Sequence, residues 1–352
     1  MTIFYILLAI FLFGVLIFVH EFGHFICAKL SGVQVNEFSL FMGPAIFQRK
    51  KGETTYSLRC IPIGGYCAME GEDEASDNPR AFGNAKLWKK LLILVAGSGM
   101  NFIAGFLITV LVVTASAGNV PTTQLSGFQE GSSLASETGL QVGDRFYSID
   151  GERIYIFGDI PMFLDRNESN VYDIVVLRDG QKVSLHDVEM KRQNYEGEML
   201  YGFSCAREEK DIGSVLSNSW NSCRNFTRLV RLGLQDLFTG AVGMDEMSGP
   251  VGIVSAVTEG GAQAESTGDG VLYVLYLFAF IAINLAVMNL LPIPALDGGR
   301  VVALLITAVA EKILRRKVNP KYEMYLHGAG MVLLLAFMAF ITFKDIFKLF
   351  GG

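Results

Sequence analysis

Long apolar runs alternate with polar segments along this chain. Residues 3–19 contain no charged side chain, and further apolar runs cover residues 91–114, 271–291 and 328–347. A helix needs about 20 apolar residues to cross a bilayer. The pattern therefore predicts a polytopic α-helical membrane protein with about four transmembrane helices, the first over residues 2–28.

The first apolar run has the general character of a signal peptide as well as of a span. No Lys or Arg precedes it, and no small-residue cleavage site follows it. We therefore expect the chain to keep this segment as a span. The overall content of hydrophobic residues, 51% of 352, is too high for an ordinary soluble protein and supports several retained spans.

The polar segments carry patterns of their own. Residues 33–41 and 54–61 resemble short strands, the second with strict alternation of apolar and polar side chains, and predict a membrane-associated β-hairpin over about residues 33–68. Short strands separated by turn signals predict a mainly β domain over residues 119–206. Residues 212–239 repeat apolar side chains at three- and four-residue steps, which is typical of an amphipathic helix that packs on protein or lies at the membrane surface.

These patterns divide the chain into four parts. Residues 1–118 hold the first two spans and the hairpin, and residues 119–206 form the β domain. Residues 207–270 hold the amphipathic helix and a linker that re-enters the membrane, with a break at Gly249-Pro250. Residues 271–352 hold the last two spans.

The distribution of Lys and Arg predicts which side of the membrane each part faces. The 29–90 loop holds nine of them and the 300–327 loop six, whereas none precedes the first span. The positive-inside rule then puts both loops in the cytoplasm, and the N-terminus, residues 119–270 and the C-terminus outside. Spans one and three run in the same direction in this arrangement. Reporter fusions after residues 60 and 160 test the predicted sidedness.

Composition excludes several classes of function. The net charge of −6 argues against a nucleic-acid partner. The five cysteines form no Cys-x-x-Cys pair, which makes a disulfide framework or a thiolate zinc site improbable. Only four histidines are present, too few for a histidine-lined metal transport path.

One short motif near the end of the first span carries chemistry. His20 and His24 are four residues apart, so on a helix they lie on one face and can hold one metal ion, with Glu21 beside it as a base. Ionisable side chains at membrane depth are costly unless they have partners. The motif therefore predicts a zinc site embedded in a transmembrane helix.

Asp297 is the predicted third ligand. His20 lies about 25 Å down the first span at 1.5 Å per residue, and Asp297 follows the inner end of the parallel third span, so both lie near the inner leaflet. A carboxylate completes a two-histidine zinc site and leaves one position for water. The alternative is that Asp297, ahead of Gly298-Gly299, only caps a helix.

Other polar residues have two interpretations each. Asn289 either contacts the substrate or makes an interhelical hydrogen bond, and we favour substrate contact. We expect Asn101 to serve helix packing rather than the site, and His186 and His327 to be surface or interface residues. We expect the acidic cluster to be a solvated face; it comprises Glu70, Glu72, Asp73 and Glu74.

Four motifs together resemble the site-2 protease family of intramembrane zinc metalloproteases, specifically its bacterial RseP-like group with a single PDZ domain. The resemblance covers nearly the whole chain. The motifs, in chain order, are His20-Glu21-Phe22-Gly23-His24, Gly97-Ser98-Gly99-Met100-Asn101, a PDZ-like stretch from Gly131 to Gly151, and Asn289 to Gly298.

The resemblance implies an extracytoplasmic PDZ domain over residues 119–206 and a multi-pass protein of the bacterial inner (cytoplasmic) membrane, with the zinc site near the cytoplasmic leaflet. It implies that His20, His24 and Asp297 bind Zn²⁺, that Glu21 activates the bound water, and that Asn289 contacts substrate. The family's β-hairpin is thought to pair with unwound substrate through a strand edge, which we expect at Phe38, Ser39, Leu40 and Phe41.

The function expected is hydrolysis of peptide bonds within transmembrane segments of membrane proteins that another protease has already trimmed. Family substrates include anti-sigma factors, signal-peptide remnants and peptide-pheromone precursors. One alternative is a catalytically inactive membrane PDZ adaptor with a structural zinc site, but such a site needs no adjacent base and usually has four protein ligands. A metal transporter is a second alternative, and spans two and four offer few polar residues for it.

Overall fold

The computed structural model describes residues 2–349 except residues 73, 75, 133, 135–138, 196, 242, 244–248 and 316–320. The chain divides into two compact units, Met1–Ile108 with Leu229–Gly352, and Thr109–Arg228. The first unit holds the membrane helices and the candidate site, and it is described first.

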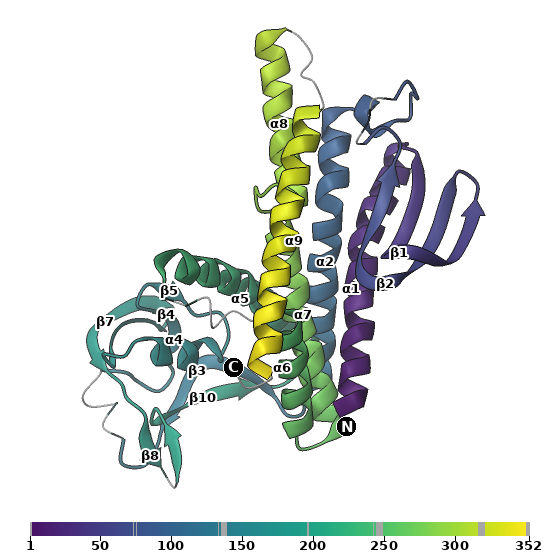
Figure 1. Ribbon diagram of the computed structural model, residues 1–352. Coiled ribbons are helices and arrows are strands. Elements are labelled where there is room, and N and C mark those ends of the chain that lie inside the picture. The colour runs from purple at the N-terminus through teal and green to yellow at the C-terminus, as the bar shows by residue number, and fades with distance from the viewer. Residues whose placement is uncertain are drawn as a thin grey trace. The chain divides into compact units, whose positions relative to one another are not determined.

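Among the described residues, four helices are long and apolar enough to cross a membrane. They are α1 (Thr2–Ser31), α2 (Leu87–Ala115), α7 (Thr267–Asn289) and residues Met324–Phe347 of α9 (Lys321–Leu349) (Figure 1). The prediction of about four spans is confirmed at the level of helix length and composition. The apolar stretch that follows the third span forms the separate helix α8 (Asp297–Leu314).

Helices α1 and α7 pack along each other in the same direction. Near their N-termini, Tyr5 lies so close to Gly270 that a Cβ there would come within 2.1 Å of the Tyr5 hydroxyl. Farther along, the rings of Phe13 and Phe278 meet edge to face at 4.9 Å. Parallel packing of the first and third spans, predicted from charge, is therefore present in the fold.

Helix α6 (Pro250–Gln263) lies where we predicted only a linker that breaks the preceding helix. Pro250 begins this helix, where a missing backbone N–H is tolerated. Buried side chains of α1, α6 and α7 form one apolar core, which stabilises α6 more than its own glycine-rich sequence would. The core residues are Tyr5, Ala9, Leu12, Leu16, Val257, Val274, Phe278 and Ala282.

Strands β1 (Val35–Lys51) and β2 (Thr54–Met69) fold back on themselves into a sheet beside α1. Phe38 pairs with Tyr56 on one side and Cys67 on the other, and the next two residues are also paired on both sides. Residues 45–51 pair only with 54–59, and residues 65–69 only with 35–40. These two stretches are therefore the edges of the sheet.

The expected open edge at residues 38–41 is consequently wrong for residues 38–40. Their backbone groups already bond to two neighbours, and Phe38 is 8% exposed and Ser39 0% exposed. Phe38 belongs to an apolar core with Ala28 and Ile93. Alternation along the sequence predicted the strand, but only the tertiary structure shows whether a strand is central or at an edge.

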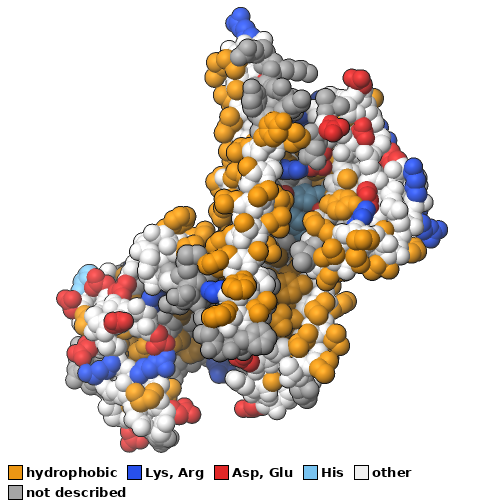
Figure 2. Space-filling view, viewed as in Figure 1, with side chains coloured by type: hydrophobic (Ala, Val, Ile, Leu, Met, Phe, Trp, Pro, Cys, Tyr) orange, Lys and Arg blue, Asp and Glu red, His pale blue; other side chains and the backbone are white. Residues whose placement is uncertain are grey.

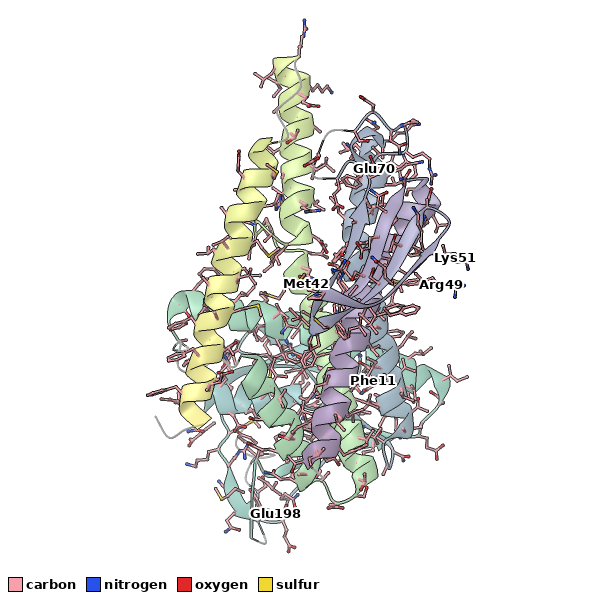
Figure 3. All side chains as sticks on the ribbon, turned by 45° about the vertical axis from the view of Figure 1, so that its right-hand side comes forward. Phe11, Met42, Arg49, Lys51, Glu70 and Glu198 are labelled. Atoms are coloured by element: carbon pink, nitrogen blue, oxygen red, sulfur yellow. The ribbon has the colours of Figure 1, made fainter. Side chains whose placement is uncertain are left out.

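The sheet has an apolar surface and a basic end. Its exposed apolar side chains are Met42, Ile46, Phe47, Leu58 and Ile61. Figure 3 shows Arg49 and Lys51 projecting away from the helices at the outer end of the sheet, whereas Met42 lies at its inner end. Exposed aliphatic side chains beside Lys and Arg are typical of a surface that contacts lipid and headgroups.

The second unit contains a sheet of order β10-β3-β4-β6-β7, with β5 paired to β4. Its strands are β3 (Val120–Phe128), β4 (Arg145–Ile149), β5 (Glu152–Arg153), β6 (Val171–Arg178), β7 (Gln181–Glu189) and β10 (Phe203–Glu208). Strands β8 (Gln193–Tyr195) and β9 (Glu198–Leu200) form a separate ribbon. A mainly β domain at residues 119–206 is thus present, and its assignment as a PDZ domain stays a prediction because part of the expected signature, including Thr138, lies outside the described residues.

The predicted amphipathic helix is present as α5 (Ile212–Thr239), and its first part belongs to the second unit. There Arg228 bonds to Asp159, the first residue of α4 (Asp159–Arg166), at 2.8 Å, and both side chains are almost fully buried. Removing one member of such a pair leaves an uncompensated buried charge. The pair therefore fixes α5 to the β domain.

Candidate metal centre

His20 and His24 lie one turn apart on α1, facing residues 93–101 of α2. The His24 residue is 8% exposed. Figure 2 shows histidine side chains at the bottom of a recess between α9 and the β1–β2 sheet. The side chains of His20 and Asp297 are 15% and 19% exposed, so the site is largely shielded but not sealed.

Asp297 meets both histidines, although it lies more than 270 residues farther along the chain. Its Oδ2 atom is 3.3 Å from His20 Nε2 and 3.4 Å from His24 Nε2, and the two nitrogens are 3.3 Å apart. Ligand bonds of about 2.0–2.2 Å in a tetrahedral zinc site place neighbouring ligand atoms about 3.3–3.6 Å apart. The three atoms therefore have the spacing of three corners of a zinc tetrahedron.

The hydrogen bonds of the rings are consistent with a cation between these atoms. His24 Nδ1 lies 2.8 Å from the carbonyl oxygen of Ile93, which can only accept. This assigns the proton to Nδ1 and leaves a lone pair on Nε2. Within the described residues, buried Asp297 Oδ2 also has no hydrogen-bond partner. Lone pairs that converge without a proton between them repel each other, and a metal ion removes that repulsion.

Asn101 contacts the site, whereas we expected it to serve packing alone. Its amide nitrogen is 3.2 Å from His20 Nδ1, and its Oδ1 atom is buried without a partner among the described residues. A half-turn of the amide puts Oδ1 toward His20, where it accepts the Nδ1 proton and leaves Nε2 free for a metal. The sequence indicated that an amide buried in a span needs a hydrogen-bond partner, because burying it alone is costly. It did not show that this partner is His20.

Two glycines allow α1 and α2 to approach closely at this point. A Cβ atom at Gly97 would lie 2.3 Å from His24 Nε2, and one at Gly23 would lie 2.5 Å from the Ala96 carbonyl oxygen. No side chain fits at either position without moving an imidazole ring or the backbone. Gly97, the first residue of the Gly97–Asn101 motif in span two, therefore makes room for the histidine pair.

A tight loop between α7 and α8 presents Asp297. A Cβ at Gly298 or at Gly299 would lie 2.2 Å from a loop carbonyl oxygen, so the first turn of α8 packs directly on the loop backbone. Helix α9 holds the loop from the other side, where His327 Nδ1 accepts the Ala295 N–H at 3.1 Å. Asp297 is the first residue of α8, and the N-cap is Leu296. The capping alternative therefore does not match the position of Asp297.

Glu21 lies beside the edge of the β1–β2 sheet. A Cβ at Gly65 would lie 2.9 Å from Glu21 Cγ and 3.2 Å from Ile17 Cγ2. The edge stretch 65–69 thus runs past the carboxylate next to the histidine pair. Gly65 and Tyr66 belonged to the predicted hairpin, and they lie in the edge stretch 65–69 that borders the site.

Asn289 of α7 and Phe41 of β1 are two further predicted site residues. Asn289 is the half-buried last residue of α7, eight positions before Asp297. Phe41 has φ of 69° and packs its ring 3.4 Å from where a Cβ of Gly14 would lie. In the acidic cluster, Glu72 pairs with Arg300 of α8 rather than lying on a solvated face, and Asp73 lies outside the described residues.

Comparisons with known proteins agree with this geometry. The family model described as Peptidase family M50 matches residues 8–337. A protein of Fusobacterium nucleatum named as a zinc metalloprotease is 36% identical over 98% of this chain and 99% of its own length. One of Clostridium perfringens with the same kind of name is 34% identical over 97% of this chain and 98% of its own. The regulator of sigma-W protease RasP of Bacillus subtilis is 28% identical over 97% and 98%.

Proposed function

The chain belongs to peptidase family M50, the site-2 proteases, and on this premise we propose that it is an intramembrane endopeptidase whose zinc ion is held by His20, His24 and Asp297. Membership makes it a metallopeptidase with several membrane helices. The observation that carries the proposal is the convergence of two imidazole nitrogens and one carboxylate oxygen within 3.4 Å of one another.

The proposed chemistry divides between the ion and Glu21. A bound zinc ion supplies Lewis acidity, which polarises a peptide carbonyl and makes water nucleophilic near neutral pH. Glu21 takes the proton of the attacking water and then delivers it to the leaving amide nitrogen. Asn101 and the Ile93 carbonyl oxygen hold the two imidazole rings in their ligating orientation.

A transmembrane substrate must be locally unwound before it can be cut. A helix hides each peptide N–H in a bond to the carbonyl four residues earlier, and freed groups need new partners within a bilayer. We assign this role to the edge stretch 65–69, which passes Glu21 and pairs on one side only among the described residues. Substrate added to this edge as a further strand would bring its backbone to the base.

Proline substitutions test the assignment of this edge. In an edge strand, successive residues direct their N–H groups to opposite sides, so either Tyr66→Pro or Cys67→Pro removes an outward N–H. We expect the variant that lacks the outward N–H to cut substrate about tenfold more slowly, as for the loss of one to two hydrogen bonds. Its zinc content should be unchanged. Single-turnover cleavage and metal analysis measure both quantities.

The opposite edge of the same sheet provides the matched control. Gln48→Pro and Arg49→Pro disturb residues 45–51, which are paired on one side but do not border Glu21. They should cleave at the wild-type rate. Equal rates for all four variants, or equal losses on both edges, would refute pairing of substrate with residues 65–69.

The proposed position of the zinc site relative to the two membrane surfaces rests on the basic residues of the β1–β2 sheet. The zinc site lies near the cytoplasmic leaflet in this proposal, with the apolar surface of the β1–β2 sheet in contact with lipid and Arg49 and Lys51 at the headgroups. The exposed Ile46 and Phe47 and the projecting basic side chains support this placement. The N-terminus and residues 119–206 are then extracytoplasmic.

The β domain at residues 119–206 has the proposed role of a PDZ-type filter for trimmed substrates. We expect a reconstituted single-span protein to be cut within its apolar segment, and its externally trimmed form to be cut faster. Mass spectrometry of the products locates the cut. Deletion of residues 120–206 should abolish the preference, and a preference that survives the deletion would exclude the filter.

The substrate class proposed is regulatory membrane proteins of the anti-sigma type, together with signal-peptide remnants. The name of the Bacillus subtilis relative, a regulator of sigma-W protease, supports the first group. Capture by a Glu21→Gln variant, which should bind substrate without cutting it, would identify the partners directly.

A further inference from the structure

An ion pair outside the metal site joins the segment that follows β2 to helix α8, which begins with Asp297. Glu72 Oε1 bonds to Arg300 Nη1, although the two residues lie 228 positions apart in the chain. The Glu72 side chain is only 14% exposed and that of Arg300 33%. Because the carboxylate partner is largely buried, this ion pair is screened less than a pair between two exposed side chains.

Each partner is attached to a different side of the site. The second carboxylate oxygen of Glu72 accepts the backbone N–H of Met69 at 3.3 Å, and Met69 is the last residue of β2 and of the edge stretch 65–69. Arg300 lies three residues after Asp297, within the first turn of α8. Glu72 is thus a direct link between the backbone of the edge strand and the helix that begins with Asp297.

The two sides of this link differ in how firmly they are held otherwise. Asp297 is fixed by the close packing of Gly298 and Gly299 on the preceding loop. Among the described residues, the edge stretch 65–69 has ladder partners on one side only, so it can shift more easily. The pair therefore acts mainly on the strand, by tying it to an element that is already fixed.

From this geometry we infer that Glu72 and Arg300 are positioning residues, which set the edge stretch 65–69 at a fixed distance from Asp297 and so align bound substrate with Glu21. This inference rests on the proposed function, since it needs Glu21 and the edge to act on the same substrate. A displacement of about 1 Å in the reacting geometry can cost about 100-fold in rate. Neither side chain needs to touch the substrate.

A double-mutant cycle tests the inference. We expect Glu72→Gln and Arg300→Gln each to lower the single-turnover rate at saturating enzyme by about 10- to 100-fold. The enzyme concentration at half-saturation should change less than about threefold, because the edge itself remains. The double variant Glu72→Gln/Arg300→Gln should lose no more than the worse single variant, because residues that act through one another are not additive.

Zinc content and a matched variant separate positioning from general damage. Zinc content should stay at the wild-type level in all three variants. Glu53→Gln serves as the control, since hydrogen bonds from Arg80 and Lys29 lower the pKa of Glu53 to about 2 and make it, like Glu72, a paired carboxylate of this part of the chain. It should retain the wild-type rate.

Three results would overturn the inference. They are wild-type rates in the single variants, losses that multiply in the double variant, and loss of zinc in parallel with activity, which would place the pair in the support of the metal ligands instead. Failure of the proposed function gives a different result, because the wild-type protein would then cut no substrate, or Glu21→Gln would cut as fast as the wild type.

Discussion

Replacement of Glu21 by Gln should abolish cleavage and leave the metal in place. The amide has the size of the carboxylate but cannot take a proton from water, so the step that generates the nucleophile loses its base. Removal of a general base lowers rates by about 100- to 10,000-fold, and we expect the upper part of this range because no second carboxylate was assigned to the step. Cleavage of a reconstituted single-span substrate and the zinc content of the purified protein are the two measurements.

The combination of the two measurements decides the role of Glu21. A variant that keeps its zinc and loses its activity identifies a base. A variant that loses both identifies a ligand or a fold defect, and full activity would place the base elsewhere. Glu53→Gln, which removes a paired carboxylate outside the site, should behave as wild type in both measurements.

Replacement of Asp297 by Asn should release the metal. The carboxylate is the only anionic group among the three converging residues, and the neutral amide is a much weaker ligand for Zn²⁺. We expect zinc content to fall at least about tenfold and cleavage to fall with it, by analogy with the 10- to 100-fold losses seen even for groups that only support a ligand. Metal analysis after dialysis against a weak chelator measures the first effect.

The helix-start alternative for Asp297 has its own control. Asp269 lies in the first turn of α7 as Asp297 does in that of α8, where an acidic side chain favours the helix dipole by about 0.3–1 kcal/mol. Asp269→Asn removes the same interaction without touching the site. If both variants kept their zinc, Asp297 would be a helix-start residue and the metal centre as proposed would be incorrect.

The residues of α1 show which structural features could be predicted from the sequence alone. The uncharged run predicted the helix, and four-residue spacing put His20 and His24 on one face, because both properties depend on neighbours within a few residues. The helix at 212–239 was predicted with the same bounds for the same reason. Charge asymmetry also predicted parallel first and third spans, and the contacts of Tyr5 and Phe13 with α7 agree with it.

The sheet beside α1 illustrates the opposite case. Residues 38–40 had the expected strand pattern, but they lie at its centre, and the edge next to Glu21 is formed by residues 65–69. A pattern of period two gives the faces of a strand and contains no information on its neighbours. The glycine-rich α6 was missed because its stability comes from packing against α1 and α7 rather than from its own sequence.

The sequence by itself predicted the spans, the histidine pair with its adjacent carboxylate, and Asp297 as a candidate for the third member of the set. Only the tertiary structure decided between the ligand and capping alternatives for Asp297, and only it showed that Asn101 reaches His20, that Gly97 makes room for the rings, and that Glu72 joins Arg300. The physical reason is the range of the interactions. Helices and faces follow from local periodicity, whereas contacts between residues 81 or 228 positions apart depend on the path of the whole chain.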